Sequence, residues 1–139
     1  MGVRETRRIL GEYLLTEADV LRGRKFEVGI ALGAWAVEFH NPKKGKVAYL
    51  FLEKEDDYYS IPAGCLIPKT LNNLLVAGRC ISTTHVAQAS TQVIGPTFAM
   101  GEAAGILGAN AADSNLAPRN VSIETIRKEL IKGGAILAV

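Results

Sequence analysis

A short loop in the second half of the chain carries the residues best suited to chemistry. Residues 82–85 are Ser, Thr, Thr and His, and they follow an apolar run at residues 74–77 that ends at Gly78. Downstream, Gly95-Pro96-Thr97 predicts a helix start, because proline is favoured in a first turn, where its missing N–H costs nothing. A helix start leaves N–H groups unpaired and carries about half a positive charge, so it suits an anion or a carbonyl that gains negative charge. The pattern indicates a ligand-binding site. The alternative is a helix that packs on a sheet and binds no ligand.

Two cysteines and two histidines are the remaining candidates for thiol or metal chemistry. Cys65, Cys80, His40 and His85 lack the close ligand pairs of a zinc site, so we predict that no metal is bound. Each cysteine precedes a Leu or an Ile, which is typical of buried, unreactive thiols rather than redox centres. With no C-x-x-C pair and no secretory leader, the sequence predicts a reducing, cytoplasmic setting.

Length and composition predict one soluble domain. The chain has 139 residues, 48% of them hydrophobic and 22% charged, which excludes wholesale disorder and fibrous designs. A net charge of +2 is too small to indicate a nucleic-acid partner. Residues 93–112 are long enough to cross a bilayer and contain one charge, Glu102, but they are rich in Ala and Gly and interrupted by Gly95-Pro96. We therefore expect a buried helix there and no membrane partner.

The first 60 residues predict strands around one short helix. A charged run turns apolar toward residue 15, so we expect a strand over residues 4–15. Thr16, followed by two acidic residues, predicts a capped helix start, and Gly23 predicts its end. The remaining elements are a half-buried strand at 29–39 in which Trp35, Val37 and Phe39 share a face, an exposed turn at 43–46, a strand at 47–52 and an acidic surface run at 53–57.

The second half predicts a strand, a loop and two helices. Ile61-Pro62 and Ile67-Pro68 bracket an extended piece, because a residue before proline avoids helical geometry. The continuous apolar run at 74–77 is typical of a strand covered on both faces. Ser122 caps a last helix, which Gly133-Gly134 ends. In the helix from Gly95, small residues on one side allow close approach of a backbone, a sheet or a flat ligand; they are Gly101, Ala104, Gly105, Gly108 and Ala112.

These elements predict the α+β class, derived from α/β: a mixed β-sheet with a short N-terminal helix, a long Gly/Ala-rich helix and a C-terminal helix. Residues 73–82 (NLLVAGRCIS), Thr84-His85 and residues 95–105 (GPTFAMGEAAG) resemble the C-terminal end of FAD-dependent oxidoreductases of the glutathione-reductase-like type. Residues 4–13 (RETRRILGEY) are similar to that family's segment RESRRIxGEY, and residues 131–137 resemble its tail.

The resemblance covers nearly the whole chain but only the final part of such a protein. It implies a partial FAD-binding domain in a single C-terminal fragment, residues 1–139. Within it, residues 1–60 would be a substrate-domain-like β segment, residues 61–112 the last strand, loop and helix of the FAD domain, and residues 113–139 a C-terminal helix tail.

The resemblance also implies FAD as the cofactor and assigns positions around it. Arg4 and Arg7 would hold an acidic substrate or the flavin edge, and His85 would donate a proton to substrate, the alternatives being solvated arginines and a structural histidine. The chain departs from the family pattern at Ala63-Gly64, where an aromatic–basic pair is expected, and at Gln92, where a basic residue is expected. The cofactor-binding positions are Gly78, Arg79 and Ser82 beside the ribityl chain, with Gly95, Pro96, Thr97, Met100 and Gly101 toward the isoalloxazine C2 carbonyl, where helix N–H groups favour reduced flavin.

The sequence contains no G-x-G-x-x-G turn of the kind that holds the FAD pyrophosphate. We therefore expect the C-terminal part of an FAD-dependent oxidoreductase that lacks its N-terminal dinucleotide-binding part, so that FAD binding is weak or absent and the isolated chain is inactive. A strand at 74–77 without its neighbours would also predict self-association. The alternative is a non-enzymatic assembly domain, or a subunit that pairs with a separate nucleotide-binding part.

Overall fold

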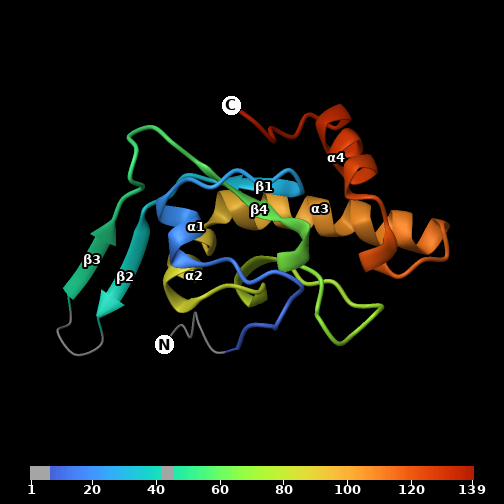
Figure 1. The fold of residues 1–139 in the computed structure, drawn as a ribbon, viewed down its shortest axis with the longest axis horizontal. Coiled ribbons are helices and arrows are strands. Elements are labelled where there is room, and N and C mark those ends of the chain that lie inside the picture. The colour runs from blue at the N-terminus through green and yellow to red at the C-terminus, as the bar shows by residue number, and fades with distance from the viewer. Residues whose placement is uncertain (1–6, 42–45) are drawn as a thin grey trace.

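The computed structural model describes residues 7–41 and 46–139, and it shows an α+β chain, as predicted (Figure 1). Three short 3-10 helices, η1 (Ala63–Cys65), η2 (Gly78–Cys80) and η3 (Pro118–Asn120), connect its longer elements. The helices and strands, in chain order, are α1 (Glu17–Leu21), β1 (Gly29–Gly33), β2 (Val37–Asn41), β3 (Lys46–Leu50), β4 (Tyr59–Pro62), α2 (His85–Thr91), α3 (Ile94–Asp113) and α4 (Ile123–Lys132).

The long helix α3 runs through the middle of the molecule, and β1, α4 and η2 pack against it (Figure 1). Met100, Ala103 and Leu107 are buried on its inner side and share one hydrophobic core with Ile61 of β4 and Leu130 of α4. Burial of such side chains is the main force that holds the elements together. This packing fixes which side of α3 faces the interior and which side is left outside.

The strands form two separate antiparallel pairs, so the predicted single mixed sheet is wrong. β1 pairs with β4, and β2 pairs with β3 from Val37 opposite Leu50 to Asn41 opposite Lys46. The expected strand over residues 29–39 is divided at Trp35, whose carbonyl accepts a hydrogen bond from Ser90 Oγ (2.5 Å). Trp35 is half exposed whereas Val37 is buried, so these two side chains do not share the predicted environment.

The local helix signals are confirmed. Thr16 and Asp19 form a capping box at the start of α1, and Gly23, at a φ of +60°, follows its end. Ser122 Oγ accepts a hydrogen bond from the Thr125 N–H at the start of α4 (3.4 Å). Each signal lies within a few residues of the helix end that it specifies, which is why the sequence alone predicts these helices.

The polar loop expected after residue 82 instead contains α2. Thr84 Oγ1 accepts a hydrogen bond from the Ala87 N–H (3.3 Å) and so caps this helix. Ser90, within this helix, is buried and its Oγ lies 2.7 Å from the Tyr59 hydroxyl. Because the tertiary structure supplies partners for these polar side chains, the helix forms despite a polar sequence.

Three further expectations about extended structure are wrong. Within the described part of residues 4–15 only two isolated bridges form, Gly11 with Pro68 and Leu15 with Thr83. The piece between Pro62 and Pro68 contains the 3-10 helix η1. Residues 74–77 form no strand, and Leu74 is exposed rather than covered on both faces.

The remaining expectations about the first half fare better. The strand expected at 47–52 is observed as β3, which ends at Leu50, and residues 53–56 of the acidic run are exposed as predicted, whereas Asp57 is only partly exposed. The turn at 43–46 falls almost wholly outside the described residues. Over the two described ranges, no helix combines the length and the apolar character that crossing a bilayer would require.

Candidate functional site

The amino end of α3 lies open at the surface. Its N-cap residue, Val93, supplies no side-chain hydrogen bond, and Ile94 is 73% exposed. A Cβ added at Gly95 would meet no atom within 4 Å. Because nothing caps this helix start, its first N–H groups and its partial positive charge remain for solvent or a ligand.

The loop at Gly78 packs directly beside this helix start. Gly78 is buried at a φ of +77°, and a Cβ built on it would lie 3.3 Å from Thr97 Cγ2. Its left-handed backbone favours glycine, and the close contact leaves little room for a side chain. Arg79 is exposed, and its carbonyl accepts a hydrogen bond from Gln88 Nε2 (3.3 Å). The structure thus brings Gly78 and Thr97 together, two of the positions expected to share one site.

The small-residue side of α3 faces outward. A Cβ added at Gly101 or Gly105 would meet nothing within 4 Å, and only Gly108 approaches a neighbour, Leu75 Cδ1, at 3.7 Å. The helix expected to be buried is therefore buried on one side only, and its other side is uncovered along much of its length. The buried side consists of Pro96, Met100, Ala103, Leu107 and Ala111.

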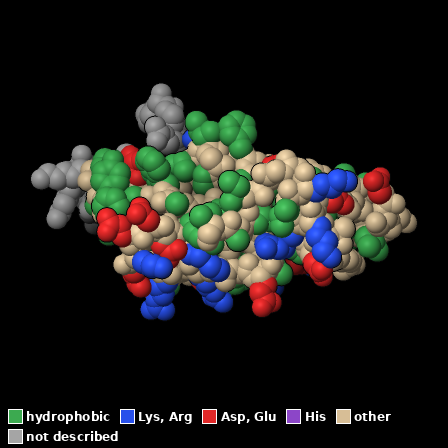
Figure 2. Space-filling model, turned by 90° about the horizontal axis from the view of Figure 1, so that it is seen from above, with side chains coloured by type: hydrophobic (Ala, Val, Ile, Leu, Met, Phe, Trp, Pro, Cys, Tyr) green, Lys and Arg blue, Asp and Glu red, His purple; other side chains and the backbone are tan. Residues whose placement is uncertain are grey.

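Open apolar hollows lie beside the first half of α3. One, of about 520 Å³, borders Gly95 and Pro96 and is lined also by Leu32, Gly33, Ala34, Trp35, Tyr58, Val93 and Val139. A second, of about 390 Å³, lies where Phe98 faces the C-terminal residues 135–137. Figure 2 looks down on the molecule from the top of Figure 1, the side of the C-terminus, and shows hydrophobic side chains across the middle of this face. A flat apolar ring could therefore lie beside the helix start without displacing the core.

Comparison with known protein families identifies the family of this chain. The model of the family described as FAD dependent oxidoreductase matches residues 1–130. The chain belongs to the FAD-dependent oxidoreductase family. Searches of curated proteins and of solved structures gave no significant match.

The residues of this FAD-dependent oxidoreductase chain fit one end of the cofactor. An uncapped helix start beside a buried Gly78 and an apolar hollow suits the isoalloxazine ring, whose C2 carbonyl accepts hydrogen bonds. The pyrophosphate end has no matching G-x-G-x-x-G turn in the sequence. When bound, FAD supplies two-electron oxidation–reduction chemistry, whereas the protein supplies position and electrostatics.

The remaining expected site residues are placed elsewhere or turned inward. Ser82 and Met100 are fully buried, so neither side chain reaches the open face of α3. His85 begins α2 and lines a different hollow, of about 560 Å³, with α1 and Glu53. Arg7 is exposed, and Arg4 lies outside the described residues. Within the described ranges, Ser82 Oγ and Thr97 Oγ1 are buried without a hydrogen-bond partner.

Asp19, which the sequence predicted only as part of a helix start, is a buried acidic residue at the centre of a hydrogen-bonded cluster near the N-terminal end of the chain. Asp19 is 4% exposed and accepts hydrogen bonds from Tyr13 Oη (3.0 Å), Thr16 N (2.9 Å) and Arg24 Nη1 (2.9 Å). Burial by itself would raise the pKa of Asp19, but the bonds from Thr16, Arg24 and Tyr13 outweigh it and lower the pKa. Arg24 also lies over the Phe26 ring (4.5 Å). These bonds tie the start of α1 to Tyr13 and Arg24, and of the whole cluster only the helix cap was predictable from the sequence.

The two thiols differ, which the sequence did not indicate. Cys65 is buried, and burial raises the pKa of its thiol to about 12, so it is inert as expected. Cys80 is exposed, so the expectation of a buried thiol is wrong there, and its Sγ lies 3.4 Å from the Ala77 carbonyl oxygen. Among the residues that the structure describes, no three His, Cys, Asp or Glu side chains are grouped to hold a metal.

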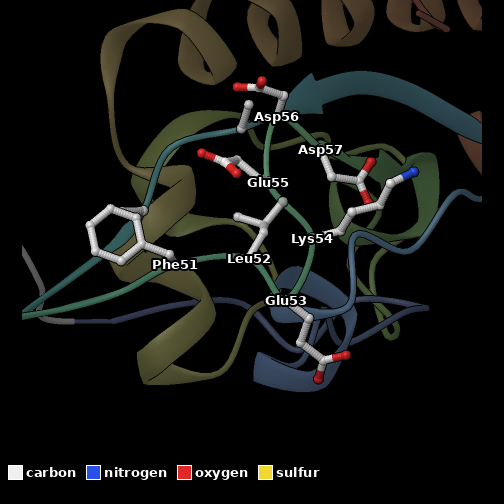
Figure 3. A pocket seen from close by; sticks show the side chains of 9 residues that line it. Phe51, Leu52, Glu53, Lys54, Glu55, Asp56 and Asp57 are labelled. Atoms are coloured by element: carbon white, nitrogen blue, oxygen red, sulfur yellow. The ribbon is translucent and has the colours of Figure 1, made fainter.

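The acidic run after β3 lines a hollow of about 720 Å³ with Ala34 and Ala36 (Figure 3). The side chains of Glu53, Glu55 and Asp56 point in different directions, so they do not converge on one cation. Asp57 is held at the rim by Lys25 Nζ, 2.5 Å from its Oδ1. The run is therefore solvated surface charge, as the sequence predicted.

Proposed function

We propose that this chain is the C-terminal part of a glutathione-reductase-like FAD-dependent oxidoreductase, and that it forms the side of the flavin site that contacts the isoalloxazine ring. The observation that carries the proposal is the uncapped start of α3 beside an apolar hollow and Gly78. Family membership supplies the cofactor, and this geometry supplies a surface that suits its ring system.

Each part of the surface has a role in this proposal. The first N–H groups of α3, near Gly95, stabilise negative charge on the flavin C2 carbonyl. Gly78 permits the neighbouring loop to approach the ribityl chain, with Arg79 beside it. The resemblance to the family adds His85 as a proton donor and Arg4 and Arg7 as groups that hold an acidic substrate, although His85 lies outside this surface, at the hollow beside α1.

The exposure of residues 74–77 and of the outer side of α3 supports the proposal that a further part of the protein covers them. Residues 74–77 lie beside α3 without forming a ladder; the Val76 N–H bonds the Leu66 carbonyl (3.0 Å). Next to them, Gly101 and Gly105 leave the outer side of α3 open. An N-terminal dinucleotide-binding part that adds strands beside residues 74–77 would cover both and bring the pyrophosphate turn. Without it, we expect the chain to be inactive; the complete protein would act in the cytoplasm.

A flavin titration tests the proposal. The chain should weakly quench the fluorescence of riboflavin, FMN and FAD. The three dissociation constants should agree within about threefold, because the proposed contacts reach the ring and not the pyrophosphate. Reduced FMN should bind roughly two- to fivefold more tightly than oxidised FMN, the usual effect of a helix start on a negative charge.

Two matched variants locate the binding. Gly95→Leu fills the hollow at the helix start and should abolish quenching. Ala109→Leu, an exposed site on the same helix about 20 Å away, should leave it unchanged. Equal effects of both variants, or affinity for FAD far above that for riboflavin, would contradict the proposed ring site. No binding of any flavin would contradict a ring site formed by this chain alone.

A further inference from the structure

The strand β3 lies at the left end of the fold in Figure 1, on the outer side of β2. In the described part of the chain it pairs with β2 alone, so its other edge has no strand partner. Val47, Tyr49 and Leu50 are exposed, and Phe51, which follows the strand, is 74% exposed. Successive residues of a strand point to opposite faces, so both faces of β3 are apolar and open.

Such a strand is poorly suited to remain at an edge. An unpaired row of N–H and C=O groups flanked by apolar side chains is a template for another strand. A two-stranded pair is also marginally stable by itself, whereas further strands with a shared apolar face stabilise it. The β2–β3 pair is anchored to the body on one side, where α2 packs against β2. The side that remains for a partner is β3.

The charges around β3 indicate what that partner is. The sequence places Lys43, Lys44 and Lys46 before and at the start of the strand, and an acidic run at residues 53–57 after it. If two copies of β3 pair antiparallel about a two-fold axis, the basic start of each strand faces the acidic end of the other. In a parallel, in-register pair, like charges would face each other instead, which is destabilising.

We propose that β3 is a self-association strand: it pairs antiparallel with β3 of a second copy of the chain and forms a four-stranded sheet in the order β2–β3–β3–β2. The pairing buries Tyr49 near the two-fold axis and joins opposite charges at both ends of the interface. A two-fold interface uses the same surface on both copies and therefore closes after two chains. This assembly does not depend on flavin binding.

Sedimentation velocity of the 139-residue chain over about a hundredfold range of concentration tests the pairing. The chain should show a dimer of twice its 14.9 kDa mass, and added salt should weaken it. Tyr49→Lys, which sets two positive charges near the axis, should weaken the dimer at least about tenfold. A chain that stays monomeric at every concentration would overturn the proposal.

Control variants separate β3 from the other open apolar surfaces. Phe98→Lys, on the 75% exposed Phe98 of α3, and Leu74→Lys, at the segment 74–77, should leave the dimer intact. A dimer that survives Tyr49→Lys and dissociates with either control would assign the contact elsewhere and refute the pairing at β3.

A charge exchange provides a readout that misfolding cannot imitate. Lys46→Glu should weaken the dimer, and Lys46→Glu combined with Glu55→Lys should restore it, because the two ends of each strand again carry opposite charge. Far-UV circular dichroism confirms that each variant is folded. If the double variant dimerises no better than Lys46→Glu, the antiparallel arrangement is wrong.

Discussion

Replacing the two open glycines of α3 with alanine should stabilise the chain. Gly101 and Gly105 lie in the interior of a helix at 94–113, and a Cβ at either position would meet nothing within 4 Å. Glycine in a helix interior costs roughly 0.8–1.0 kcal/mol relative to alanine, mainly because the unfolded chain is more flexible. With no clash to offset this gain, the double variant should raise the free energy of unfolding by about 1.5–2 kcal/mol.

Urea unfolding followed by far-UV circular dichroism measures the change, with the fluorescence of Trp35 as a second probe. The unfolding midpoint should rise without a change in slope, and the melting temperature should rise by about 3 °C for each kcal/mol in a chain of this length. A matched control is Gly33→Ala, whose Cβ would lie 2.4 Å from the Tyr59 ring and should destabilise the fold.

The same double variant separates stability from function. If the flavin also contacts the open side of α3, added methyl groups should weaken flavin binding while they stabilise the chain, the usual compromise at a functional surface. Loss of stability in the double variant would refute the reasoning, because it would mean that the small-residue side of α3 is packed in solution.

Three further outcomes follow from individual contacts. Gly78→Ala should cost about 1–2 kcal/mol, measured by urea unfolding, because alanine is strained at a φ of +77° and its Cβ would lie 3.3 Å from Thr97 Cγ2. A thiol reagent should label Cys80 rapidly and Cys65 only on unfolding, since Cys65 is buried and its thiol has a pKa of about 12; equal labelling rates in the native chain would contradict this. Asp19→Ala should cost about 1–2 kcal/mol at neutral pH through loss of the capping box. Because the folded pKa of Asp19 is below its usual 3.8, this stabilisation is present above pH 3.8 and disappears as the pH falls through the folded value, so unfolding curves of the two proteins should converge in acid.

Most of the correct predictions about the fold came from short sequence motifs at the ends of helices. The capping box at Thr16, the serine cap at Ser122 and the Gly-Pro start of α3 each act within one helical turn, so a single sequence reveals them. Helix α2 was missed because its inward polar residue Ser90 is satisfied by Tyr59, a partner 31 residues away. Strand pairing depends on such distant partners even more strongly, which is why the division at Trp35 was not foreseen.

For the candidate site, too, the features set by local sequence were predictable and those set by distant contacts were not. The sequence predicts the Gly78 turn and a helix start within one residue of Ile94, where α3 begins uncapped, and the fold brings Gly78 against Thr97. The placement of Ser82 and His85 could not be predicted, because it depends on how residues 80–92 fold back onto the core. Ser82 is held inside by hydrogen bonds with the backbones of Leu15 and Cys65, residues distant in sequence.

The wrong prediction at residues 74–77 is informative about the whole protein. An apolar run of this kind is typical of strands buried between layers, yet Leu74 is exposed and the run forms no ladder. The small-residue side of α3, beside it, is likewise suited to close packing and meets nothing at Gly101 and Gly105. Two neighbouring segments thus carry sequences that favour burial, and both are partly exposed on the same flank of α3. One additional sheet layer would satisfy both, which is the physical reason for proposing a dinucleotide-binding part at this flank, while β3, at the opposite end of the molecule, remains available to a second copy.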